Sequence, residues 1–254
     1  GGLSAKEEAW LGDLVKEIPW AGAFYRASER SFVSFANKMR VDVFTQLFRQ
    51  LERDGVANRQ NAKGIATFVN TAMGRGELPI FQKAATDLSV LFFSPRLQAS
   101  RFNMLNPIWY AKLPPPVRKE AIKTMAQFIG TGATVLGLVK LYGGPNVQVE
   151  TDTRSTDSGK IRVGNVRWDI WAGFQQWVRV YSQMLTGERK TARGKIIKLS
   201  EKEFPFESRF DVAQRFIQGK LAPVPALVAE LMQGQTFFGE DIELTQELAE
   251  NIVP

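Results

Sequence analysis

Side chains that do chemistry in most enzymes are sparse in this sequence. Histidine and cysteine are absent from all 254 residues. Their absence excludes disulfides, thiolate nucleophiles, zinc sites of the usual kind and Ser-His-Asp or Cys-His catalysis. The remaining candidates for acid-base work are two pairs of neighbouring carboxylates, at 7–8 and 240–241. Both pairs lie in polar settings typical of helix starts or loops, so we expect neither pair to be catalytic.

Metal ions and nucleotides have no predicted site either. Asp152, Asp157 and Asp169 could gather a hard cation, but their spacing lacks the dense oxygen ligands of a calcium loop, which favours a solvated loop. Glycines at 130, 132 and 137 fall in a helical pattern without the lysine or the preceding strand of a phosphate-binding loop. We therefore expect no catalytic residue, no cofactor and no metal site, and we interpret the chain as non-enzymatic.

Positive charge is concentrated in the middle of the sequence. Residues 154–198 carry 10 basic and 3 acidic side chains, whereas residues 199–254 carry 4 and 10. Such density can attract phosphates or anionic lipid, and it is also typical of a solvated surface. If the chain contacts nucleic acid, we expect the contact residues to be Arg154, Arg162, Arg167, Arg189, Lys190, Arg193, Lys195 and Lys198.

A small β insertion is predicted within this basic region, at about residues 147–169. Strand-like segments at 147–149, 160–163 and 166–169 include a hairpin on the two-residue turn Gly164-Asn165. Alternation along the hairpin places Arg162 and Arg167 on a solvent face, so we rank the arginines above the nearby tryptophans as contact residues. The side chains expected to turn inward are Ile161, Val163, Val166 and Trp168.

The longest apolar segment, residues 124–139, contains no charged side chain. Its 16 residues are fewer than the roughly 20 that cross a bilayer, which favours a buried core helix, and its glycines would let another segment approach closely. Contact with a membrane is the alternative. In that case the candidate membrane residues are Phe128, Ile129, Val135, Leu136 and Leu138.

Helical periodicity dominates the rest of the chain. We expect the stripe formed by Phe32, Phe35, Met39, Val43, Leu47 and Leu51 to be core. A stiff connector is expected at 113–116 and a basic loop at 188–198.

The predicted fold is mainly α, a multi-helix bundle-like array with one small β-hairpin insertion. We predict a helical region at 1–112 and a second at 113–254, with one continuous domain as the alternative. The expected helices are 4–18, 21–54, 58–73, 81–93, 95–106, a segment from 117, 170–185, 210–217, 226–232 and 244–252.

Several segments resemble a domain near the carboxyl end of the large polyvalent proteins and related internal virion or ejection proteins of tailed phages. The resemblance extends over nearly the whole chain. Its segments are IPW at 18–20, RASER at 26–30, FFSPRLQASR at 92–101, GKIRVGN at 159–165, DIWAGFQQ at 169–176, KLAPVP at 220–225 and FGE at 238–240. The bare ends of the sequence also indicate a piece of a longer chain.

This resemblance implies a structural or interaction segment that is packaged in the capsid and ejected with the genome. Any enzymatic module would lie elsewhere in the longer chain. The implied partners are other virion proteins of the portal, tail or core, and further copies of the chain, first in the virion interior and then in the host cell. The alternatives are a module of the ejection machinery that engages genomic DNA or the inner membrane, and an anti-restriction accessory domain of an injected polyvalent protein.

Overall fold

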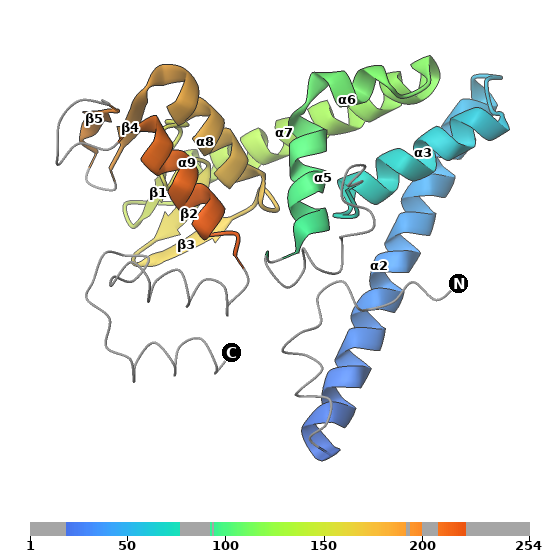
Figure 1. Cartoon of the computed structure of the whole chain (residues 1–254), viewed down its shortest axis with the longest axis horizontal. Helices are drawn as coiled ribbons and strands as arrows, with labels where there is room; N and C mark the ends of the chain where they lie inside the picture. Colours follow the sequence, from blue (N-terminus) through green and yellow to red (C-terminus); the bar gives the residue numbers. More distant parts are fainter. Residues whose placement is uncertain (1–18, 77–91, 93, 192–193, 200–207, 222–254) are drawn as a thin grey trace. The chain divides into compact units, whose positions relative to one another are not determined.

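The computed structural model describes residues 19–76, 92, 94–191, 194–199 and 208–221. These residues form seven helices and two small antiparallel sheets, so the fold is mainly α with a small β insertion, as predicted. They divide into two compact units, one up to Lys123 with Leu221, and one from Thr124 to Lys220 (Figure 1). The helices expected at 4–18, 226–232 and 244–252 lie outside the described residues, as does nearly all of the one expected at 81–93.

The first unit is built on α2 (Pro19–Arg53) and α3 (Arg59–Ala72), both close to their predicted ranges. Their connection follows from the sequence: Gly55 adopts a left-handed backbone, and the Asn58 side chain accepts a hydrogen bond from Asn61 N at 2.8 Å. The two helices pack through the carboxyl end of α2, where Leu51 is buried with Ile65 and Phe68 of α3.

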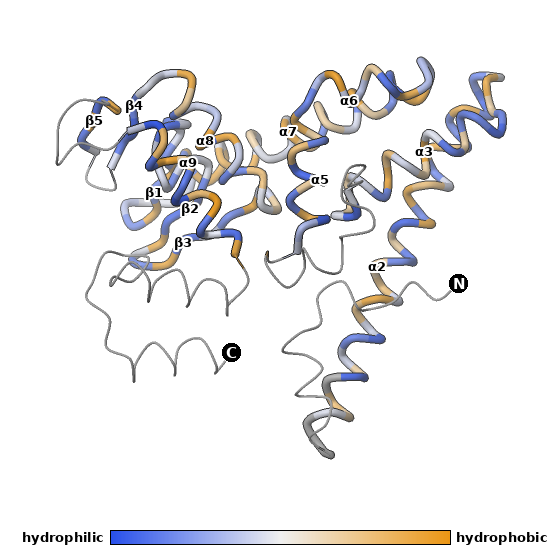
Figure 2. The backbone as a smooth tube through the Cα atoms, viewed as in Figure 1, coloured by the Kyte–Doolittle hydropathy of each residue, from blue (hydrophilic) through white to orange (hydrophobic). Residues whose placement is uncertain are grey.

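The expectation that the whole apolar stripe of α2 is core is wrong. Leu51 is only 1% exposed, but Phe35 is 65% and Phe32 is 69% exposed. Figure 2 shows that apolar positions continue along α2 beyond the part that lies beside α3. Periodicity identified a shared face correctly, but α2 has 35 residues and α3 only 14, so α3 cannot cover the whole stripe.

Two shorter helices, α5 (Pro95–Leu105) and α6 (Pro107–Ala111), follow. Asn106 separates them as predicted, and its side chain accepts from Ile108 N at 3.0 Å. Ser94 occupies the N-cap position of α5, but its side chain makes no cap hydrogen bond, because its backbone is left-handed. The Ser100 hydroxyl of α5, fully buried, donates to the carbonyl oxygen of Thr71 in α3 at 2.6 Å. This hydrogen bond joins α5 to the core of the unit.

Helix α7 (Pro115–Tyr142) begins inside the expected connector, because two prolines are tolerated in the first turn of a helix. Val117 and Ala121 are buried in the first unit. Between Ile122 and Tyr142, by contrast, Leu136 alone is buried. The preferred interpretation of residues 124–139 as a buried core helix is therefore wrong, although the segment is helical.

The second unit contains a three-stranded antiparallel sheet of β1 (Val147–Val149), β2 (Lys160–Val163) and β3 (Val166–Asp169). Arg162 lies opposite Arg167, and Ile161 lies opposite Trp168, so the predicted division into two faces is confirmed. The apolar face is not buried as expected: Val163 and Val166 are exposed, and Trp168 is 61% exposed.

Helix α8 (Phe174–Thr186) starts four residues later than predicted, because Ala172 and Gly173 both have positive φ angles. The expected basic loop is partly wrong, since it contains a short hairpin of β4 (Glu188–Lys190) and β5 (Ile196–Lys198). Helix α9 (Arg209–Gln218) closes the unit and is capped by Ser208, whose side chain accepts from Asp211 N. The ring of Trp177 in α8 meets that of Phe216 in α9 at 4.8 Å.

Candidate functional site

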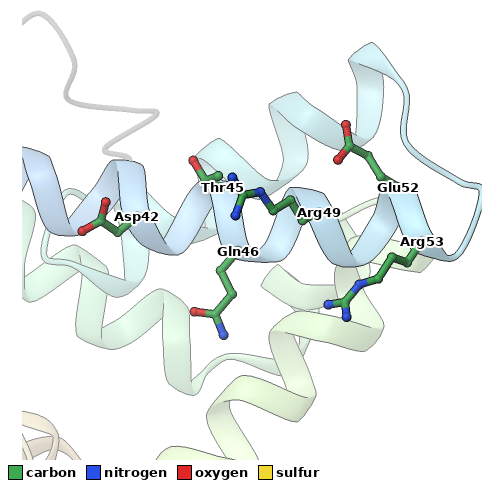
Figure 3. Close-up of a pocket in the computed structure, with 6 residues that line it drawn as sticks. All are labelled: Asp42, Thr45, Gln46, Arg49, Glu52 and Arg53. Carbon is green, nitrogen blue, oxygen red and sulfur yellow. The ribbon is translucent and has the colours of Figure 1, made fainter.

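A surface hollow on α2 is lined by Asp42, Thr45, Gln46, Arg49, Glu52 and Arg53. All six come from one helix, and Figure 3 shows their side chains pointing in different directions from it. Asp42 pairs with Lys38 at 2.6 Å on the exposed surface, and Arg53 donates to Gln50 at 2.7 Å. The hollow therefore presents polar groups along a helix without converging them on one point.

The three carboxylates considered as cation ligands are instead engaged in ion pairs or in a backbone hydrogen bond. Asp152 pairs with Arg154 at 2.8 Å, Asp157 pairs with Arg167 at 2.9 Å, and Asp169 accepts from Trp171 N at 2.8 Å. Within the described residues, no three metal-ligating side chains form a group. The carboxylate pairs at 7–8 and 240–241 lie outside those residues.

An ion-pair network joins the loop after β1 to β4. Arg154 contacts Asp152 and also Glu188, at 2.5 Å, while Lys190 contacts Glu150 at 2.6 Å. The side-chain hydrogen bond from Arg154 lowers the pKa of Asp152 to about 2. Burial would raise the pKa of Glu150, but hydrogen bonds from Lys190 and from the Asp152 backbone bring it below its ordinary value. Arg154 and Lys190 are therefore paired with carboxylates of the chain itself.

The residues predicted to contact nucleic acid therefore differ in whether a carboxylate already pairs with them. Arg154, Arg167 and Lys190 are neutralised by neighbouring carboxylates, and Arg193 lies outside the described residues. Arg162 donates to the Gly164 carbonyl oxygen at 2.9 Å. Of the predicted contact residues, Lys195 and Lys198 are exposed and have no ion pair to any described residue.

Three cations, two of which sequence reasoning missed, come from α8, β4 and the segment just after α9, and they influence one another electrostatically. They are Arg179, Arg189 and Lys220, which we call the cationic cluster. Burial lowers the pKa of Arg179, and the positive charge of Arg189 lowers it further. Burial and the charge of Arg179 in turn lower the pKa of Lys220. Arg189 alone of the three had been predicted as a contact residue.

Contacts from α8 and α9 hold the Lys220 side chain in place. The Lys220 ammonium donates to the side-chain oxygen of Gln176 and lies 5.1 Å from the centre of the Phe216 ring. The Nε atom of Arg179 is buried and donates to no acceptor. The available signal was the helical spacing of α8, which places Arg179 on the face of the buried Gln175 and Gln183. Polar residues on one face of a helix normally predict that the face is exposed to solvent. The spacing alone therefore did not identify Arg179 as a partly buried cation.

Three sets of exposed apolar side chains among the described residues each belong to one helix or one sheet. The first is the aromatic row of α2, which we define as Phe24, Phe32, Phe35 and Met39; at 100° per residue these side chains fall within one 80° sector of the helix. The second is on α7, where Ile129, Val135 and Leu138 of the predicted membrane residues are exposed, Phe128 is half-buried and Leu136 is buried. The third is the apolar face of the sheet.

Among the described helices, α7 alone is long and apolar enough, by length and composition, to cross a membrane. One side of it is occupied within the second unit, where Phe128 contacts the rings of Trp171 and Phe174, each at 5.8 Å. Ile129, Val135 and Leu138, by contrast, are exposed.

Comparison with known proteins gives no relative: no family model, curated protein or solved structure matches the chain.

Proposed function

We propose that this chain is a non-enzymatic interaction segment of a large virion protein of a tailed phage, packaged in the capsid and ejected with the genome. Its role is to attach to other virion proteins of the portal, tail or core. The virion setting comes from the sequence resemblance. The mode of action comes from the surface, and the observation that carries it is the aromatic row of α2.

Burial of the aromatic row would release a substantial free energy. Phe24 is 79% exposed, and the phenylalanines at 32 and 35 are nearly as accessible. Covering one large apolar side chain contributes roughly 1.5–3 kcal/mol. Exposed large apolar side chains gathered on one face are typical of an interaction site in soluble proteins, and a single helical face fits a groove on a partner protein.

The polar chemistry described above is consistent with an interaction segment. In the second unit, Arg154, Arg167 and Lys190 all pair with carboxylates. Networks of this kind orient loops, and their members already have partners. Neither the α2 hollow nor the ion-pair network brings a nucleophile, a base and an electrostatic stabiliser together, which is the geometry that catalysis requires.

The proposal is tested by locating the chain in particles of the phage that encodes it. Quantitative mass spectrometry would compare purified particles before and after DNA release, with the major capsid protein as the internal standard. We expect the chain to be present in filled particles and depleted from emptied ones. Its absence from filled particles, or its full retention in emptied ones, would contradict the proposal.

A second candidate function is binding to a lipid bilayer through α7. The observation that favours it is the run of outward apolar residues on a helix of 28 residues, about 42 Å long, against a hydrocarbon core of about 30 Å. Liposome flotation would test it with Ile129→Lys combined with Leu138→Lys, and with Val166→Lys in the sheet as the matched control. Flotation of the parent and the control, but not of the α7 variant, supports this function, and a parent chain that stays in the soluble fraction removes it.

A further inference from the structure

Strand β3 forms an edge of the three-stranded sheet. The sheet order is β1-β2-β3, so β2 lies beside one edge of β3, and no strand of the described residues lies beside the other (Figure 1). All four residues of β3 are exposed. An edge strand presents unpaired backbone N–H and C=O groups, which are a template for pairing with a further strand.

The turn between β2 and β3 determines which backbone groups point outward. It has two residues and places Val163 directly opposite Val166. In such a hairpin the closing pair is hydrogen-bonded, and hydrogen-bonded pairs alternate with non-bonded pairs along the strands. Val166 and Trp168 therefore bond to β2, whereas the N–H and C=O groups of Arg167 and Asp169 point away from it. No described residue bonds to these outward backbone groups.

These outward groups restrict how a second copy of β3 can pair antiparallel with the first. Only Arg167 and Asp169 can form hydrogen-bonded pairs across the new edge. A register that pairs either residue with its own copy places like charges opposite each other, which is destabilising. The register that pairs Arg167 with Asp169 of the second copy places opposite charges at both bonded pairs. It also places Trp168 opposite its own copy, at a non-bonded pair, where side chains are closest.

We propose that two copies of this chain associate through β3 in this register, so that their sheets join into one continuous antiparallel sheet. Within one chain, Arg167 lies opposite the like charge of Arg162, and Asp169 lies opposite Lys160. In the pair of copies, each Arg167 gains a carboxylate on its other side, and each Asp169 lies between two cations. Opposite charges that face each other across strands stabilise a sheet.

Both charged side chains have capacity for this contact. Asp157 accepts from Nε of Arg167 at 3.0 Å, and the two terminal nitrogens of the guanidinium group donate to no described residue. One oxygen of Asp169 accepts from Trp171 N at 2.8 Å, which leaves the other oxygen as an acceptor. The new ion pair therefore forms without breaking the contacts within each chain.

The apolar face of the sheet supplies a second contribution. Trp168 is 61% exposed and Val166 is 55% exposed. In this register Trp168 packs against Trp168 of the second copy, and Val166 lies opposite Ile170 of the second copy. Aromatic pairs across strands stabilise antiparallel sheets. A partner sheet thus accounts for an apolar face that one chain leaves exposed.

The contact is small, because β3 has only four residues. Short strand pairs are marginally stable in water, so we expect a dissociation constant roughly in the micromolar to millimolar range. The inference concerns the second unit alone and does not rest on attachment through the aromatic row of α2. The two ideas fail separately, because variants of β3 leave α2 unchanged and Phe35→Ser leaves β3 unchanged.

Sedimentation equilibrium of the full 254-residue chain measures the association, and charge reversal tests the register. We expect a monomer–dimer equilibrium in the parent chain. Arg167→Glu and Asp169→Lys should each weaken self-association about tenfold or more, because each variant places like charges opposite each other at both bonded pairs. An equimolar mixture of the two variants should restore dimerisation, because opposite charges then meet at both pairs. Arg162→Glu on β2 is the matched control and should dimerise like the parent.

Restoration in the mixture keeps loss of contact separate from loss of folding, because two misfolded variants would not rescue each other. Circular dichroism of each variant alone checks that it is folded. Three results would overturn the proposal: a parent chain that stays monomeric up to about 1 mM, variants that dimerise as tightly as the parent, or a mixture of folded variants with no gain over either one. Self-association that Phe35→Ser abolishes and the charge reversals do not change would also overturn it, because the contact would then lie on α2.

Disulfide trapping tests the register without changing any charge. The chain has no cysteine, so Trp168→Cys introduces a single thiol. Residues opposite each other at a non-bonded pair have Cα atoms about 4.5 Å apart, which is within the range of a disulfide. Val166→Cys is the matched control on the same face, because the two copies of position 166 would lie more than about 13 Å apart in this register. We expect oxidation to link Trp168→Cys into covalent dimers and to leave Val166→Cys monomeric. Equal crosslinking at the two positions, or none at position 168, would contradict the proposed pairing.

Discussion

The indole ring of Trp171 covers Gly132 of α7 so closely that a Cβ atom at position 132 would lie 2.5 Å from the ring. The ring cannot easily withdraw, because its Nε1 donates to the Gly159 carbonyl oxygen at 2.9 Å and its plane meets Phe128 edge to face. Gly130 and Gly137 of the same helix have open space where a Cβ would be. Of the three helical glycines, Gly132 is therefore the one whose lack of a side chain permits close packing.

Gly132→Ala should destabilise the second unit by about 1–3 kcal/mol, because the added methyl group must displace a ring held on two sides. Chemical denaturation followed by tryptophan fluorescence measures the change. Gly130→Ala is the matched control and should stabilise the chain by about 0.5–1 kcal/mol, since alanine replaces glycine at an open helical position. Equal effects of the two substitutions would refute the role given to Trp171.

Removing either of two buried hydroxyls between α3 and α5 should change the stability of the chain, but in opposite directions. Ser100→Ala breaks the hydrogen bond to the Thr71 carbonyl oxygen and should cost about 1 kcal/mol or more. Thr71→Val replaces a buried hydroxyl oxygen that has no partner, so stability should stay the same or rise by about 1 kcal/mol. Urea denaturation of both variants checks this, and a Thr71→Val variant less stable than Ser100→Ala would be inconsistent with the described packing.

Acid should weaken the second unit through the ion-pair network. The pKa of Asp152 is about 2 in the folded chain and near 3.8 ordinarily, so its stabilising contribution is complete above about pH 4 and is lost as the pH falls toward 2. Glu150 and Asp211 shift in the same direction. Asp152→Asn should lower the stability at pH 7 by about 1 kcal/mol and reduce the dependence on pH below 4. Thermal unfolding between pH 2 and 7 would show this, and an unchanged acid dependence in Asp152→Asn and Arg154→Gln would contradict it.

Substitutions at the two ends of the α2 stripe should differ in their effect on the free energy of unfolding. Leu51→Ala removes a fully buried side chain and should cost about 2–5 kcal/mol. Phe35→Ser removes an exposed ring and should change the free energy of unfolding by no more than about 0.5 kcal/mol. Denaturation curves of the two variants provide the comparison. A loss at Phe35 as large as that at Leu51 would mean that the ring is part of the core.

Local rules predicted much of the fold. Gly55 and Asn58 delimit α2 and α3, Asn106-Pro107 separates α5 from α6, and Gly164-Asn165 fixes the register of the hairpin. In each case the signal and the structure it specifies lie within a few residues. The start of α8 was missed because a positive φ at Ala172 is unusual for a residue with a side chain.

Burial and long-range contacts could not be predicted in the same way. Periodicity groups Phe32, Phe35 and Leu51 on one face, but only the extent of α3 determines which of them is covered. The apolar composition of residues 124–139 predicted a helix but did not specify which of its side chains the second unit covers. The cationic cluster required Lys220 to return beside Gln176, 44 positions earlier in the chain, and neither residue carries a local signal of that contact.

Attachment through the aromatic row of α2 is tested most directly by placing a photo-crosslinking phenylalanine analogue at position 35 and irradiating intact particles. Position 30, exposed on the opposite side of α2, is the matched control. We predict that position 35 forms a specific crosslink to another virion protein, or to a second copy of the chain, and that position 30 does not. Crosslinking that is absent at position 35, or equally strong at position 30, would contradict the attachment role.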